Sequence, residues 1–223
     1  MLVKHWMTKD VVWVEDDASM METSQIMREK KVRLVPVLSK GKLVGIVSDR
    51  DIKAASPSKA TTLDVHELYY LLSKLSVKDV MTKQPFTITE DETVERAAVI
   101  MLDKHISGLP VLDESDKLVG VLTQGDVFRV LTAITGVFRG GYQFAFELED
   151  RSGSMREVAD VIRSHGGRLT SALALYDRAP KGYRTVFLRA SDLDDDKVPG
   201  LVEELKSRFK FLYHVKNEKV IYS

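Results

Sequence analysis

The sequence predicts an α+β protein in which two copies of a strand-helix-strand-strand-helix unit precede a separate domain of order βαββαβ. Three observations lead to this prediction: an internal repeat, hydrophobic periods that switch between those of helices and strands, and a glycine-rich break in the second half. The length of 223 residues is sufficient for two ordinary domains.

The internal repeat fills the first part of the chain. Residues 3–38 recur 74 positions later, with 12 of 36 residues identical. The matching stretches are Val3-Lys4 with Val77-Lys78, Met7-Thr8-Lys9 with Met81-Thr82-Lys83, and Pro36-Val37-Leu38 with Pro110-Val111-Leu112. After one inserted residue the match resumes, with Lys42–Gly45 matching Lys117–Gly120 and Asp51 matching Asp126. Two copies of one supersecondary unit therefore occupy residues 1 to about 135.

Hydrophobic periodicity assigns the elements of each copy. Thr89 and Glu92 form a capping-box pattern that predicts the start of a helix in the second copy. The helix stripes are Val94, Ala97, Ala98, Met101 and Leu102 in the second copy, and Met20, Thr23, Ser24 and Met27 in the first. Strands are expected at 34–38, 43–47, 109–112 and 118–122. We expect the first repeat over 1–60, a linker helix over 61–76 with an apolar face at Val65–Leu75, and the second repeat over 77–135.

A second domain is expected over 142–223, after Gly136 and Gly140-Gly141. Its strands are predicted at 144–148, 169–176, 183–190 and 211–215. The intervening helix stripes are Met155, Val158, Ala159 and Ile162, and then Val198, Leu201, Val202, Leu205 and Phe209. This βαββαβ order is that of a ferredoxin-like sandwich.

Composition excludes several classes of function. Lys plus Arg and Asp plus Glu are both 33, so no global field favours nucleic acid. The absence of cysteine excludes disulfides and thiolate chemistry, and indicates a reducing cytoplasm. No apolar run approaches the roughly 18 residues that span a bilayer, and the first residues lack the apolar core of a signal peptide. We therefore expect neither nucleic acid nor a membrane as partner.

Catalytic motifs were not found. The sequence has no phosphate-binding glycine loop, no nucleophile elbow and no zinc-binding His-Glu-x-x-His, and its histidines show no ligand spacing. The acidic run Asp192–Asp196 is expected to be a solvated loop that caps the next helix. The prediction is a protein that is not an enzyme and holds no metal.

Two equivalent strand ends remain, Gly45–Asp51 and Gly120–Asp126. Each places a hydroxyl three residues before a carboxylate where a strand passes into a helix. Free N–H groups at a helix N-terminus favour phosphate, and a carboxylate can accept hydrogen bonds from the vicinal hydroxyls of a ribose. Ser, Thr and Asp are also ordinary capping residues, so spacing alone leaves a ligand site and a pair of caps both open.

The recurring motifs resemble a tandem pair of CBS domains, a Bateman module. They are Val-x-x-x-Met-Thr at Val3–Thr8 and Val77–Thr82, Leu-Val-Pro-Val or Gly-Leu-Pro-Val, and Gly-x-x-Ser/Thr-x-x-Asp. The second domain resembles an ACT domain, although Asp150–Gly153 replaces the usual Asp-x-Pro-Gly and Gly167-Arg168-Leu169 replaces Gly-x-Asn-Ile. The whole order is similar to the acetoin-utilisation B type of bacterial regulatory protein.

The resemblance implies an adenine nucleotide (AMP, ADP or ATP) in two clefts. One cleft would use Thr8, Val32, Arg33, Val121, Thr123 and Asp126, and the other Ile46, Ser48, Asp51, Thr82, Ile106 and Ser107. A small amino acid would contact Ser152, Gly153 and Arg168 of the ACT-like domain. Both modules also imply a homodimer.

Three functions follow as alternatives: a non-catalytic regulatory sensor, an enzyme subunit of acetoin metabolism, and a purely structural assembly module. We favour the sensor. The first cleft is expected to bind charged nucleotides more tightly, because Arg33 stands where the second copy has Ser107.

Overall fold

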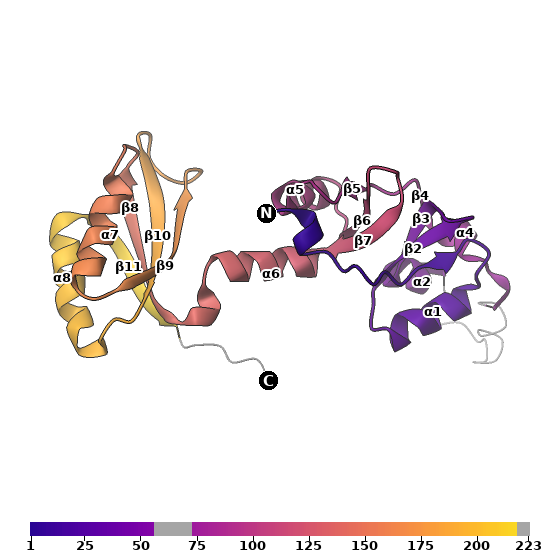
Figure 1. Cartoon of the computed structure of the whole chain (residues 1–223), viewed down its shortest axis with the longest axis horizontal. Coiled ribbons are helices and arrows are strands. Elements are labelled where there is room, and N and C mark those ends of the chain that lie inside the picture. The colour runs from indigo at the N-terminus through magenta and orange to yellow at the C-terminus, as the bar shows by residue number, and fades with distance from the viewer. Residues whose placement is uncertain (56–72, 218–223) are drawn as a thin grey trace. The chain divides into compact units, whose positions relative to one another are not determined.

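The computed structural model describes residues 1–55 and 73–217 of the chain (Figure 1). It divides into two compact units, Met1–Phe128 and Arg129–Ser223. Most of the predicted linker helix lies outside the described residues, so this element stays a prediction. Within the described ranges, no helix has the length and apolar character needed to cross a bilayer.

The first repeat has the predicted order of elements. They are β1 (Val14–Glu15), α1 (Met20–Glu29), β2 (Leu34–Ser39), β3 (Lys42–Ser48) and α2 (Asp49–Ala55). Strand β1 runs parallel to β2, and β2 runs antiparallel to β3. Met20, Thr23 and Met27 of the predicted stripe are buried, and the two methionines join Val35, Val37, Val47 and Ile52 in one apolar core.

The second repeat follows the same path. Its elements are β5 (Ile88–Thr89), α5 (Val94–Asp103), β6 (Gly108–Leu112), β7 (Leu118–Thr123) and α6 (Gln124–Ile134). Again the first strand is parallel to the second, and the second is antiparallel to the third. The prediction of strand, helix, strand, strand, helix is confirmed in both copies.

The predicted capping box at Thr89 and Glu92 is wrong. Thr89 lies in β5 and is paired with Leu112, so its backbone is extended there. The helix starts one turn later, where the Thr93 hydroxyl accepts from the Arg96 N–H at 3.1 Å. With this start, Leu102 lies at the margin of the buried stripe and is 72% exposed.

The opening segment of the first repeat packs on the second repeat. The short helix η1 (Val3–His5) begins where the Val3 N–H donates to the Glu92 carbonyl at 2.9 Å. Thr8 and Val121 exchange two backbone hydrogen bonds, at 2.9 and 3.0 Å. Residues 1–8 are therefore a structural part of the second repeat.

The opening segment of the second repeat makes the reciprocal contact. It forms α4 (Val77–Val80) and β4 (Thr82–Lys83), and β4 completes the sheet of the first repeat in the order β1-β2-β3-β4. The Val77 N–H donates to the Ala18 carbonyl at 2.8 Å, and Thr82 is the register partner of Ile46. Each repeat is thus completed by the other.

The two repeats thus exchange their opening segments, and in each exchange a methionine side chain packs directly against a glycine of the other repeat. A Cβ built on Gly120 would lie 2.3 Å from Met7 Sδ, and one built on Gly45 would lie 2.2 Å from Met81 Sδ. Any side chain at these two glycines would displace the methionine. The recurrence of Met and Gly in the two copies therefore has a steric reason.

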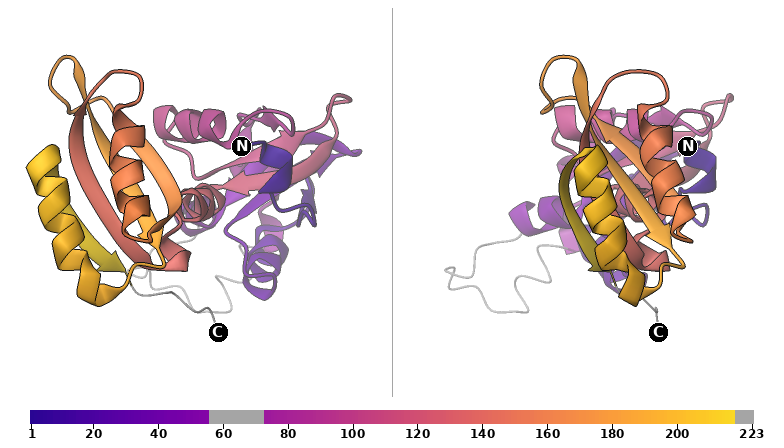
Figure 2. Two further views of the ribbon diagram at one scale, coloured as in Figure 1. Left: turned by 60° about the vertical axis from the view of Figure 1, so that its left-hand side comes forward. Right: turned by 90° about the vertical axis from the view of Figure 1, so that its left-hand side faces the viewer.

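The second unit has the predicted βαββαβ order. Its elements are β8 (Gly141–Glu149), α7 (Ser154–Ser164), β9 (Arg168–Leu175), β10 (Tyr183–Ser191), α8 (Val198–Arg208) and β11 (Lys210–Asn217). The antiparallel sheet has the order β11-β8-β10-β9, and both helices lie on one of its faces (Figure 2). Phe144, Phe146, Ile162, Leu188 and Leu201 form the centre of its core. The acidic loop caps the short helix η3 (Asp195–Lys197) through Asp194, whereas the predicted cap of the following helix is wrong, because α8 begins after Lys197 with no side-chain cap.

We expect Gly120→Ala to lower the free energy of unfolding of the first unit by about 1–3 kcal/mol, because the new methyl group overlaps Met7. The matched control is Gly125→Ala, whose Cβ would meet only Thr123 Oγ1 at an ordinary 3.5 Å. Urea denaturation measures both changes. Equal midpoints for the two variants would contradict the proposed steric role.

Candidate functional site

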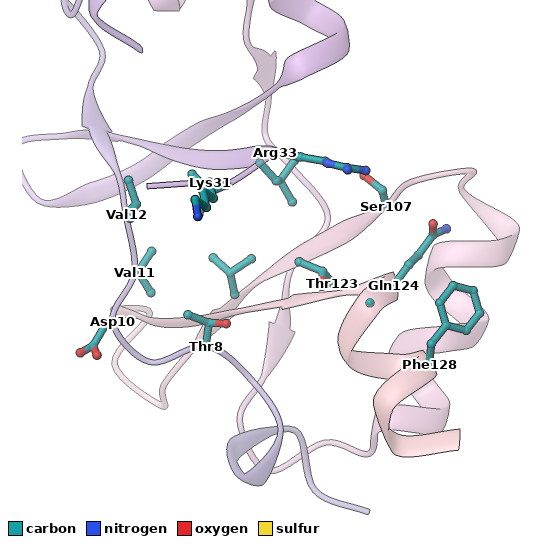
Figure 3. A pocket seen from close by; sticks show the side chains of 14 residues that line it. Thr8, Asp10, Val11, Val12, Lys31, Arg33, Ser107, Thr123, Gln124 and Phe128 are labelled. Carbon is teal, nitrogen blue, oxygen red and sulfur yellow. The ribbon is translucent and has the colours of Figure 1, made fainter. Parts of the chain in front are cut away.

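A cavity of about 510 Å³ lies within the first unit, where both repeats contribute side chains (Figure 3). This volume is in the usual range for small-molecule sites. The lining residues are Thr8, Asp10, Val11, Val12, Lys31, Val32, Arg33 and Leu34 from the first repeat, and Ser107, Val121, Thr123, Gln124, Gly125 and Phe128 from the second.

Five of the six residues predicted for the first cleft line this cavity. The sixth, Asp126, is 4% exposed and stands behind Thr123 at the first turn of α6. Its Oδ2 accepts from the Thr123 N–H at 2.9 Å and from the Thr123 hydroxyl at 2.7 Å. The Asp126 N–H in turn points at Thr123 Oγ1 at 3.3 Å. The structure therefore brings the predicted set together and shows a reciprocal cap within it.

The hydrogen bonds between Thr123 and Asp126 determine whether the Thr123 hydroxyl can donate or accept a hydrogen bond with a ligand. A hydroxyl has one proton, and that of Thr123 is donated to Asp126. Its oxygen faces the cavity with acceptor capacity only. This end of the cavity therefore matches a ligand group that donates hydrogen bonds, such as a sugar hydroxyl, better than a phosphate group, whose oxygens accept.

Another part of the cavity wall is positively charged, because Lys31 and Arg33 line it. Lys31 follows α1 in a left-handed conformation, with φ 54°, and the Val32 N–H closes the helix end on the Met27 carbonyl at 3.0 Å. This turn sets Lys31, Val32 and Arg33 along the cavity, and in Figure 3 Arg33 extends in the direction of Ser107. Two exposed cations at one site suit an anionic group.

Arg33 also acts on a neighbouring carboxylate. The pKa of Asp49 is held below its usual value, mainly because Lys53 Nζ donates to it, with Arg33 and Arg50 adding favourable charge. The Asp49 N–H donates to the Arg33 carbonyl at 3.0 Å, so the two residues are tied through the backbone. The backbone of Arg33 is therefore anchored while its side chain is exposed to the cavity.

Sequence reasoning missed Lys31 and Phe128. Lys31 directly precedes the predicted pair Val32-Arg33, which was a usable signal. Phe128 is 63% exposed on α6, one turn beyond Gln124, and an exposed aromatic ring beside a ligand motif could also have been noticed. In Figure 3 Phe128 lies on the opposite side of the view from Val11 and Val12, so apolar side chains line the cavity on both sides.

The second predicted cleft repeats part of this geometry. Asp51 Oδ2 accepts from the Ser48 N–H and from the Ser48 hydroxyl, each at 2.7 Å. Ile46 and Thr82 are paired across β3 and β4. Ser107, predicted for this cleft, lines the first cavity, and the carbonyls of Ile106 and Ser107 accept from Gln124. The side chain of Ser107 is therefore an addition to the first cleft.

Of the three residues predicted as an amino-acid loop, one lines a groove of the second unit. Gly153 has φ 86° and lines a groove of about 510 Å³ in the second unit. Ser152 and Arg168 are exposed, and neither is among the described residues that line that groove.

Comparisons with known proteins agree with the repeat. A CBS domain family model matches residues 3–58 and 77–133. An uncharacterized protein of Methanocaldococcus jannaschii is 33% identical over 154 residues, which cover 59% of this chain and 91% of that protein. An inosine-5'-monophosphate dehydrogenase of Korarchaeum cryptofilum is 33% identical over 153 residues, which cover 69% of this chain but only 27% of the enzyme.

Solved structures give the same result. The CBS-pair protein CBSX2 of Arabidopsis thaliana is 32% identical, with a TM-score of 0.53 and coverage of 60% of this chain and 96% of CBSX2. A structure of CBSX2 in complex with AMP is 34% identical, with a TM-score of 0.49 and coverage of 60% and 98%.

The cap at the start of α6 can be tested through stability. Thr123→Val keeps the shape of the side chain but removes the hydroxyl that bonds Asp126, and should destabilise the first unit by about 0.5–2 kcal/mol. Thr132→Val is the control, because the Thr132 hydroxyl only bonds the Arg129 carbonyl within the same helix. If urea denaturation gives Thr123→Val the same midpoint as the parent protein, the cap does not stabilise the unit.

Proposed function

The chain belongs to the CBS domain family, and from this premise we propose that its tandem pair is a non-catalytic regulatory module that binds an adenine nucleotide, AMP, ADP or ATP. The observation that carries the proposal is the cavity shared by the two repeats, with cations at Lys31 and Arg33 and, at Thr123, an acceptor whose proton is donated to Asp126 behind it. A nucleotide combines an anion, hydroxyl donors and a flat ring, and the cavity offers a counterpart to each.

In the proposed complex the ribose hydroxyls donate to Asp126 and Thr123, and the phosphates contact Arg33 and Lys31. The base lies among the apolar side chains that include Val32 and Val121. CBSX2 supports this ligand class, since it has been crystallised in complex with AMP. Ser48 and Asp51, with Ile46, Thr82 and Ile106, form a second and weaker site in the proposal.

Regulation would follow from the exchange of opening segments. A ligand that contacts both repeats stabilises the arrangement in which they are joined, and shifts the population toward it. Arg33 and Thr123 belong to different repeats and line the same cavity, so a ligand there contacts both repeats. This coupling needs no chemical step.

We propose that the second unit is an ACT domain, on the support of its βαββαβ order and antiparallel sheet. The corresponding boundaries are 1–60, 61–76, 77–135 and 142–223. A small amino acid at this unit has the support of Gly153 alone among the three predicted residues. A structural assembly module, or a subunit associated with an enzyme of acetoin metabolism, is the alternative function.

Arg33→Ala should weaken nucleotide binding about tenfold to a hundredfold, because a charged hydrogen bond contributes roughly 1.5–3 kcal/mol. Asp126→Ala should impair the same site, while Asp51→Ala should leave it largely intact. Calorimetric titration with AMP and ATP measures all three. Arg28→Ala is the control for charge alone, because Arg28 is an exposed cation of the same repeat that does not line the cavity.

Wild-type affinity in Arg33→Ala, together with loss of the tight site in Asp51→Ala, would reverse the assignment of the dominant cleft. No binding of either nucleotide to the parent protein would favour the assembly module instead.

A homodimer is the proposed oligomeric state. Sedimentation at micromolar concentration should give about twice the chain mass of 25.1 kDa. A species at the mass of a single chain would reject the dimer.

A further inference from the structure

The sheet of the second unit has two edges that differ in chemistry. Strand β11 carries Lys210, His214 and Lys216, and charged side chains of this kind discourage another strand from pairing with an edge. Strand β9 is the opposite edge and has no charged residue from Leu169 to Leu175. Within the described residues its outer backbone groups pair with no other strand. Only β9 is therefore a suitable template for an added strand.

A groove lies beside this edge. Helix α7 packs against β9, and between them is the cavity of about 510 Å³ that Gly153 lines. The groove exists because small residues stand on the helix side of β9: Ala172 and Ala174 are the register partners of the buried core residues Leu188 and Val186. At the other edge the equivalent space is filled by Phe211, which packs on the core.

The groove is basic. Arg156, Arg163 and Arg184 line it, and no carboxylate is among the described lining residues. Asp160 bonds Arg156 and Arg163, and Asp150 bonds Arg184, so the five groups together keep one positive charge.

Arg184 adds a second indication. Its side chain is 16% exposed, and its Nε is buried with no hydrogen-bond partner among the described residues. A buried donor without an acceptor is uncommon, so the guanidinium of Arg184 keeps an unsatisfied polar group beside the groove.

We propose that β9 and the adjoining groove bind an extended acidic segment of a partner protein, which adds to the sheet as a fifth strand. Main-chain hydrogen bonds to β9 provide affinity, and alternate side chains of the segment enter the groove. The carboxylates of the segment enter the groove and meet the three arginines, and its apolar side chains point to the opposite face of the sheet, on the side of Leu173. Charge complementarity selects the acidic segment over a neutral or basic one.

The test uses the full chain and a fluorescent peptide of about eight residues that alternates valine and glutamate. Anisotropy should show saturable binding, and hydrogen exchange should show new protection of backbone amides within Leu169–Leu175. The same peptide with lysine in place of glutamate should not bind. A version N-methylated at alternate amides keeps the charge but should also fail, because it cannot pair with β9.

Matched variants distinguish the effect of the groove arginines from the effect of the overall positive charge of the protein. Arg156→Gln with Arg163→Gln removes two exposed cations of the groove and should weaken peptide binding at least tenfold. Arg178→Gln removes an exposed cation outside the groove and should change the affinity less than twofold. Nucleotide titration of the double variant should match the parent protein, which keeps this test independent of the nucleotide site.

The proposal is overturned by no binding of the glutamate peptide, by equal binding of the lysine or N-methylated peptides, or by binding without protection of β9. Protection of β9 that rises with protein concentration alone would also overturn it, and would assign this edge to a second copy of the chain. Free glutamate binding as tightly as the peptide would instead assign the groove to a small amino acid, and also reject the added strand.

Discussion

The exchange of opening segments between the two repeats is the constraint on which the first unit depends. Met7 lies against Gly120 and Met81 lies against Gly45, so neither repeat has a complete sheet or core without the other. The paired hydrogen bonds between Thr8 and Val121 fix the register of the first exchange. A site that needs side chains from both repeats is a direct consequence of this geometry.

The polar groups of the candidate site serve the fold and the ligand together. Thr123 and Asp126 satisfy each other at the start of α6, which removes orphan donors from the helix end. The same bonds commit the hydroxyl proton and leave acceptor character toward the cavity. The sequence left two alternatives for these residues, a helix cap and a ligand site. In this arrangement the same residues can serve as both.

The second unit places its potential for interaction at one edge of the sheet. Large side chains close the space beside β11, whereas alanines leave it open beside β9. Arginines of α7 and β10 then give the open groove its charge. These properties arise from residues far apart in sequence that the sheet order β11-β8-β10-β9 brings to the same or opposite edges.

The sequence by itself determined the two repeats and the βαββαβ order, because periodicity and turn residues are local signals. Five of the residues that line the cavity were implied by the resemblance of the repeats to CBS domains. The sequence pattern misplaced the start of α5, since Thr89 and Thr93 are both plausible caps until the pairing of Thr89 with Leu112 excludes the first. Only the tertiary structure decided which repeat each opening segment completes, that Ser107 joins the first cleft, and that Lys31 and Phe128 line it. These depend on contacts between distant segments, which spacing along the chain does not encode.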